Sequence, residues 1–172
     1  PRCFEIEEKL KEICDIPVFH DDQHGTAIIV TAAVINALKL VKKDKKNCKA
    51  VISGAGAAGT AITKMLLNFG IGEIIVCDKN GILNRNNTEL NPAQLSLAQI
   101  TNNSLMTGKL EDAFVGADIF VGVSAPSIVT GDMIKSMADS PIVFAMANPV
   151  PEIMPDIAKQ AAHICATFSR VV

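Results

Sequence analysis

The clearest structural pattern in the sequence is KAVISGAGAAGTAITKMLLNFG, residues 49–70. It starts with a short β-branched segment that ends at Ser53, continues through a glycine-rich turn, and then places apolar residues at helical spacing. Gly70 follows the last of these residues, as glycine commonly does at the end of a helix. The stretch therefore predicts a strand, a tight turn and a helix in direct succession.

The turn of this unit has the spacing G-x-G-x-x-G. In dinucleotide-binding domains the first glycine permits the tight turn, the second lets the backbone approach a pyrophosphate, and the third lets helix and sheet pack closely. The helix N-terminus then faces negative phosphate. A βα turn that binds no ligand is the alternative. The predicted cofactor contacts are Gly54, Ala55, Gly56, Ala57, Ala58 and Gly59.

An acidic residue ends the next apolar segment, EIIVCD, which predicts a second buried strand. This residue, Asp78, stands 19 positions after Gly59. A carboxylate at this place accepts hydrogen bonds from ribose hydroxyls and repels a 2′-phosphate, which favours NAD over NADP. Lys79 beside it weakens that preference, so NADP stays possible.

The rest of the chain alternates apolar strands with helices. Further strands are predicted at 117–124, 141–148 and 163–168, and helices at 90–102, 110–116, 130–138 and 154–162. The helix over 90–102 has Asn91 as its predicted N-cap. Strands buried on both faces that alternate with helices predict an α/β fold with a doubly wound parallel sheet, the Rossmann type. A short amphipathic helix, EIEEKLKEIC, precedes this alternation.

Composition excludes several classes of partner. The 172 residues carry a formal net charge of −2 without a large basic field, which disfavours nucleic acid. The apolar run at 27–38 is shorter than the roughly 20 residues of a bilayer span, so a buried helix and no membrane partner are predicted. Five scattered cysteines without C-x-x-C spacing indicate neither disulfides nor a thiolate zinc site, and favour a reducing, cytoplasmic location.

Two turns follow the third and fourth predicted strands at their carboxyl ends. These are SAPS at 124–127 and NPVPE at 148–152. Ligands of open α/β sheets bind at this edge, so Ser124, Ala125 and Asn148 are candidate site residues. The Asn148 amide is suited to orient a polar substrate or a ribose. The alternative is that both segments are ordinary strand-ending turns.

A polar cluster, PVFHDDQHGT, occupies residues 17–26. His20 and His24 have the four-residue spacing of H-E-x-x-H zinc hydrolases, whereas Asp21 and Asp22 favour Mg²⁺ or Mn²⁺.

The surroundings of the cluster argue against the zinc hydrolase interpretation. Pro17 and Gly25 disfavour the regular helix that this zinc site needs. With Thr26 as the predicted N-cap of the following helix, the cluster is expected in a loop. Carboxylates that only stabilise the helix start are the remaining alternative.

Taken in order, five segments resemble the NAD(P)-binding part of malic enzymes, particularly the shorter bacterial type. The resemblance runs from Pro1 to about Ala166. It implies oxidation of L-malate with NAD(P)⁺ and decarboxylation of the bound oxaloacetate to pyruvate and CO₂, with Mg²⁺ or Mn²⁺. The segments are PRCFEIEEKLKE, IPVFHDDQHGTA, GAGAAG, LEDAFVGADIFVGVSAPS and ANPVPEI.

The resemblance also implies roles for single residues. Asp22 corresponds to a metal ligand, with Asp21 as a carboxylate beside the metal site, near the catalytic lysine. Ser124 and Ala125 would line the nicotinamide-side ribose, and Asn148 would contact malate or that ribose. The glycine turn and Asp78 would bind the rest of the dinucleotide.

The chain departs from the family pattern in its catalytic residues. In the family a Glu-Asp pair that binds the metal, a general-acid Tyr and a general-base Lys all precede PRCFEIE, and this chain contains no Tyr. Near the end, ATFSRVV stands where the family has ATGRSD. We therefore expect a fragment without catalytic residues and without appreciable turnover alone.

The expected domain organisation follows from the same resemblance. Residues 1–25 would be a remnant of the preceding catalytic domain and linker, and residues 26–172 a C-terminally truncated NAD(P)-binding domain. The intact enzyme is expected to be a homodimer or larger homo-oligomer. The alternatives are a Rossmann domain of an amino-acid or methylene-folate dehydrogenase, or a dinucleotide-binding module without catalysis.

Overall fold

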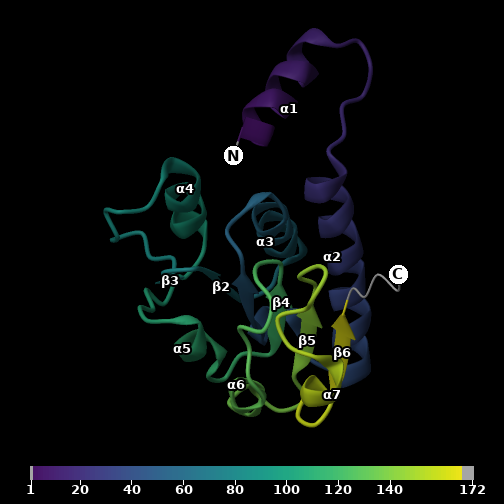
Figure 1. Cartoon of the computed structure of the whole chain (residues 1–172), viewed down its shortest axis with the longest axis vertical. Coiled ribbons are helices and arrows are strands. Elements are labelled where there is room, and N and C mark those ends of the chain that lie inside the picture. The colour runs from purple at the N-terminus through teal and green to yellow at the C-terminus, as the bar shows by residue number, and fades with distance from the viewer. Residues whose placement is uncertain (1, 168–172) are drawn as a thin grey trace.

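The computed structural model describes residues 2–167, without the side chains of Arg2, Phe4 and Asp22. A six-stranded sheet in the order β3-β2-β1-β4-β5-β6 forms its centre (Figure 1). The strands are β1 Lys49–Ser53, β2 Glu73–Asp78, β3 Gly81–Ile82, β4 Ile119–Gly122, β5 Ile142–Ala145 and β6 Ile164–Thr167. The helices are α1 Arg2–Ile13, α2 Asp21–Val41, η1 Lys45–Asn47, α3 Ala57–Phe69, α4 Pro92–Ile100, α5 Leu110–Phe114, α6 Gly131–Lys135 and α7 Pro155–Ala158.

The predicted doubly wound sheet is confirmed, with one exception at its edge. All strand pairs are parallel except the antiparallel pair of β2 and β3, and the short strand β3 is not apparent from the sequence. β1 lies between β2 and β4, with Ser53 opposite Cys77 on one side and Gly122 on the other. The chain order reverses here, and at such a switch point the carboxyl ends of the strands open a crevice for ligands.

Two apolar cores lie on the two faces of the sheet. Neighbouring residues of β1 point to opposite sides, so Ile52 belongs to one core and Val51 to the other. The first core contains side chains of α2, α3 and α4, and the second contains side chains of α5, α6 and α7. Strands covered on both faces explain why their sequences are almost uninterrupted apolar runs.

The start of α2 corrects a prediction. The helix begins at Asp21 with His20 as N-cap, so Thr26 lies inside the helix and its predicted role as N-cap is wrong. The backbone N–H groups of Gln23 and His24 donate to the His20 carbonyl at 3.1 and 2.9 Å. These hydrogen bonds form the first helical turn before the predicted start at Thr26. The expected loop is therefore correct only for residues 17–20 of the polar cluster, and residues 21–26 form the first turns of α2.

Gly25 accommodates this helix start. A Cβ at Gly25 would lie 2.0 Å from Oδ1 of Asp21, so the carboxylate uses the space that the missing side chain leaves. The domain boundary expected after residue 25 falls within α2, and the domain division itself stays a prediction.

α2 is longer than the apolar run that predicted it. Its segment Gln23–Val41 is long and apolar enough to cross a membrane, a test that core helices also pass. Val30 and Val34 are 2% and 0% exposed in the core beside α3, whereas Ile28 and Ile29 are 50% and 56% exposed. The predicted buried helix is thus confirmed for one face only.

Other helix ends follow the expected local chemistry. Asn91 caps α4, accepting a hydrogen bond from Gln94 N at 3.0 Å, while Asn91 N donates to Oε1 of Gln94 at 3.1 Å. The last predicted strand is observed as β6, and its predicted end at Phe168 lies outside the described residues.

Candidate functional site

A hollow of about 500 Å³ opens at the carboxyl ends of β1, β2 and β4. Five of the predicted cofactor residues meet there: Gly54, Ala55, Asp78, Ser124 and Ala125. The other described side chains and backbone groups of its wall come from Ser53, Lys79, Asn80, Gly81, Lys109, Leu110, Glu111 and Ile128. Segments more than 70 positions apart, such as those of Ser53 and Ser124, thus form one concave surface.

Packing within the protein requires two of the three glycines in the turn. Gly54 has φ +117°, and a Cβ there would lie 2.7 Å from the Val123 carbonyl oxygen. A Cβ at Gly59 would lie 1.7 Å from the Gly54 carbonyl oxygen, because α3 crosses directly over the turn. These two glycines set the path of the chain from β1 into α3.

Packing within the protein does not require a glycine at position 56. Its φ of −88° suits any residue, and a Cβ there would meet nothing within 4 Å. Gly56 is the N-cap of α3, with no side-chain hydrogen bond at the cap and no acidic residue in the first turn. Ala57 and Ala58 continue into that turn. A helix start without a side-chain cap, and with open space in front of it, suits an anion such as phosphate.

Asp78 is held in place by its neighbours at the edge of the hollow. Its Oδ1 accepts a hydrogen bond from Asn80 N at 2.8 Å, and its Oδ2 accepts one from Nε2 of Gln94 at 2.7 Å. Each carboxylate oxygen has a further lone pair for a ribose hydroxyl. Gln94 was missed in the sequence, although its capping-box position three residues after Asn91 was the available signal.

Ser124 lies on the opposite wall. Its Oγ is 2.9 Å from Oγ of Ser53, and its backbone N–H donates to Oε1 of Glu152 at 2.9 Å. Asn148 does not line the hollow; it is exposed at the end of the neighbouring strand β5, before the cis peptide bond to Pro149. The structure therefore brings Ser124 and Ala125 to the site and leaves Asn148 beside it.

The predicted metal residues lie at the start of α2. The Asp21 side chain is exposed, and that of Asp22 lies outside the described part of the structure. Within the described part, no group of three or more His, Cys, Asp or Glu side chains is placed to hold a metal ion. The described side chains at the start of α2 therefore form no complete metal site, and the zinc interpretation of His20 and His24 gains no support.

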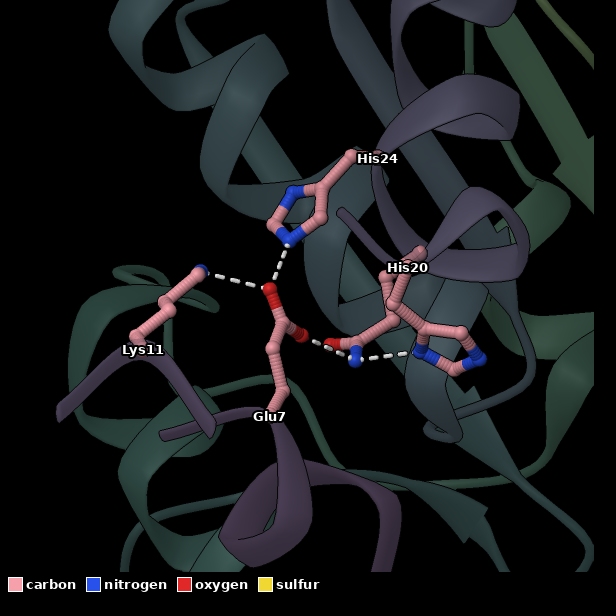
Figure 2. Close-up of polar contacts among 5 residues, drawn as sticks. Glu7, Lys11, His20 and His24 are labelled. Atoms are coloured by element: carbon pink, nitrogen blue, oxygen red, sulfur yellow. Dashed lines mark hydrogen bonds and ion pairs between the residues drawn. The ribbon is translucent and has the colours of Figure 1, made fainter. Parts of the chain in front are cut away.

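The two histidines instead contact a network around Glu7 of α1 (Figure 2). Oε1 of Glu7 lies 2.6 Å from Nε2 of His24 and 2.5 Å from Nζ of Lys11, and Oε2 accepts from Nε2 of Gln23 at 2.7 Å. Nε2 of Gln23 also lies 2.6 Å from Nδ1 of His20. The hydrogen bond from Lys11, and then that from His24, lowers the pKa of Glu7 from its usual 4.5 to about 2.

A family model described as the malic enzyme NAD-binding domain matches residues 23–165 of this chain. The chain belongs to the malic enzyme family. This assignment excludes the alternative of an amino-acid or methylene-folate dehydrogenase domain.

Relatives and solved structures agree with this assignment. The chain is 52% identical over 167 residues to an NAD-dependent malic enzyme of Geobacillus stearothermophilus, covering 97% of this chain and 35% of that protein. It is 46% identical over 172 residues to an NADP-dependent malic enzyme of Salmonella typhimurium, covering 96% and 22%. The crystal structure of an NAD-dependent malic enzyme from Thermotoga maritima matches with a TM-score of 0.96 and 48% identity, covering 99% and 46%. The chain thus spans less than half the length of these malic enzymes.

The glycine turn gives a paired prediction. Gly59→Ala should lower the free energy of unfolding by about 3 kcal/mol, because its Cβ overlaps the Gly54 carbonyl. Gly56→Ala should change it by less than about 1 kcal/mol, yet weaken NADH binding at least about tenfold by filling the space before the helix start. Urea unfolding and NADH titration measure the two effects. A Gly56→Ala chain that binds NADH normally would contradict the anion site.

The Glu7 network predicts a pH-dependent attachment of α1. Because folding lowers the pKa of Glu7, its contribution is complete above pH 4.5 and is lost as the pH falls from 4.5 towards 2. Glu7→Gln should reduce hydrogen-exchange protection of α1 at neutral pH by roughly tenfold to a hundredfold, since hydrogen bonds to a charged group contribute about 1.5–3 kcal/mol. Glu8→Gln, at an exposed neighbour, is the control. Equal protection in the two variants would refute this role.

Proposed function

We propose that this chain binds the dinucleotide in a malic enzyme that oxidises and decarboxylates L-malate to pyruvate. The observation that carries the proposal is the open space before the uncapped start of α3, at the switch point of the sheet. Pyrophosphate would bind at the Gly56 amide and the first turn of α3, where N–H groups lack intrahelical partners. The named relatives, which are NAD- and NADP-dependent malic enzymes, support the same class of ligand.

The proposed cofactor is NAD, with NADP as the second candidate. The Asp78 carboxylate lies on the wall of the hollow, where it would accept the ribose hydroxyls and repel a 2′-phosphate. Lys79 and Lys109 line the same wall and would reduce that repulsion. The balance favours NAD because the carboxylate is fixed by Asn80 and Gln94.

The remaining catalytic roles stay proposals for the complete protein. Asp22 would bind Mg²⁺ or Mn²⁺ with ligands from elsewhere in the enzyme, and Asn148 would contact malate or the nicotinamide ribose. The described residues of this chain supply no complete acid, base and metal set, so the chain alone is proposed to bind dinucleotide without turnover. All five cysteines are free thiols, in keeping with a proposed reducing, cytoplasmic location. A homo-oligomeric enzyme is also proposed.

Nucleotide fluorescence tests the cofactor assignment, because the chain contains no Trp and no Tyr to interfere. NADH should bind more tightly than NADPH. Asp78→Ala should weaken NADH roughly tenfold or more, since hydrogen bonds to a carboxylate contribute about 1.5–3 kcal/mol, and should weaken NADPH less. Asp132→Ala, which removes an exposed carboxylate on α6, is the control. Failure of the unsubstituted chain to bind either nucleotide would overturn the proposed function.

The metal assignment is tested in the complete protein. Asp22→Ala should weaken Mn²⁺ binding by at least about tenfold, since a lost carboxylate ligand removes charge from a site of hard oxygen donors. Electron paramagnetic resonance of free and bound Mn²⁺ measures the affinity directly, without turnover. Asp15→Ala, which removes an exposed carboxylate before α2, is the control. Unchanged Mn²⁺ affinity in Asp22→Ala would remove this residue from the metal site.

A further inference from the structure

Glu152 is a fully buried carboxylate beside the proposed dinucleotide site. It ends the turn after β5 and is 0% exposed. Its Oε1 accepts a hydrogen bond from Ser124 N at 2.9 Å, and its Oε2 accepts one from Ala147 N at 3.0 Å. Ser124 lies two residues beyond the end of β4 and Ala147 two residues beyond the end of β5. One carboxylate thus holds the loops that leave two neighbouring strands.

The fold makes room for this carboxylate in the middle of the sheet edge. A Cβ at Gly122, the last residue of β4, would lie 2.3 Å from Cδ of Glu152. Any larger residue at this position would displace the carboxylate from the two N–H groups. Gly122 and Glu152 therefore form a matched pair, in which a missing side chain accommodates a buried charge.

A gain in folding stability does not explain why a carboxylate is buried at position 152. Among the described residues, no Lys, Arg or His forms an ion pair with Glu152. Burial of a carboxylate costs free energy that backbone N–H groups offset only in part. The carboxylate instead fixes the position of the two loops, because hydrogen bonds to a charged acceptor are short and geometrically specific.

The Glu152 carboxylate fixes the wall of the hollow that faces Asp78. Ser124 is held at its N–H by Glu152 and at its hydroxyl by Ser53 Oγ, 2.9 Å away. Ser124 and the adjacent Ala125 both line the hollow. A dinucleotide crosses the switch point, with its adenosine half on the side of β2 and its other half beyond the pyrophosphate, on the side of β4.

We propose that Glu152 is a positioning residue that holds the segment of Ser124 and Ala125 to receive the nicotinamide half of the dinucleotide. This inference rests on the proposed function. Glu152 acts through Ser124 and has no contact with the ligand itself. Its loss should weaken ligands that reach beyond the pyrophosphate and leave ligands that end there unaffected.

The experiment compares NADH with ADP, which carries the adenosine and diphosphate groups but no nicotinamide. In Glu152→Gln an NH₂ group replaces one acceptor oxygen and faces a backbone N–H, so one of the two loops is released. Calorimetry on the 172-residue chain should show roughly tenfold weaker NADH binding and an ADP affinity unchanged within about twofold.

Two further variants separate positioning from general destabilisation. Gly122→Ala keeps the carboxylate but displaces it, and should change the ratio of NADH to ADP affinity in the same direction. The double variant should be no worse than the more affected single variant, because both remove the same contact. Thr130→Ala, which removes the cap hydrogen bond of α6, should lower the thermal midpoint and leave the ratio unchanged.

The outcomes distinguish the two claims. NADH binding that is unchanged in both Glu152→Gln and Gly122→Ala overturns this inference alone. Equal weakening of NADH and ADP also overturns it, because the effect would then be a general one. An unsubstituted chain that binds neither NADH nor NADPH overturns the proposed function together with this inference. If Glu152→Gln does not fold, Gly122→Ala decides the question with the same pair of ligands.

Discussion

The close approach of α3 to the end of β1 determines where the site and the main apolar core lie. Only a glycine at position 59 lets the helix lie over the Gly54 carbonyl, where a Cβ would be 1.7 Å from the oxygen. This contact brings the N-terminus of α3 to the sheet edge and presses Ile62 and Leu66 into the core with α2. The same constraint therefore creates both the main apolar core and the uncapped helix start at the site.

Two carboxylates at this sheet edge have different roles. Asp78 is partly exposed and keeps lone pairs for a ligand, while Gln94 holds it from α4. Glu152 is buried and uses its oxygens on Ser124 N and Ala147 N. One carboxylate faces the hollow and the other organises its wall. The buried carboxylate therefore adds a polar connection between the loops after β4 and β5, whose Val129 and Ile153 also share one apolar core.

The sequence predicted what depends on local pattern and missed what depends on distant contacts. Buried parallel strands are apolar throughout, so the alternation was visible, as was the cap at Asn91. The start of α2 was misplaced because Gly25 was interpreted as a helix breaker, whereas it makes room for the Asp21 carboxylate. Glu152 was missed as a site residue because its partner Ser124 is 28 positions away, and no local pattern marks such a pair.

The N-terminal helix shows how charge can replace apolar packing. Of the described side chains of α1, Glu7 alone is buried, while Ile6 and Ile13 are 54% and 75% exposed. Its hydrogen bonds to His24 and Gln23 orient α1 against the helix that carries Asp21 and Asp22, yet bury little apolar surface. Apolar burial supplies most of the free energy of packing in proteins, so the attachment of α1 depends mainly on these hydrogen bonds. Polar contacts from Glu7 thus fix the position of α1 beside the first turn of α2, although little apolar surface is buried between the two helices.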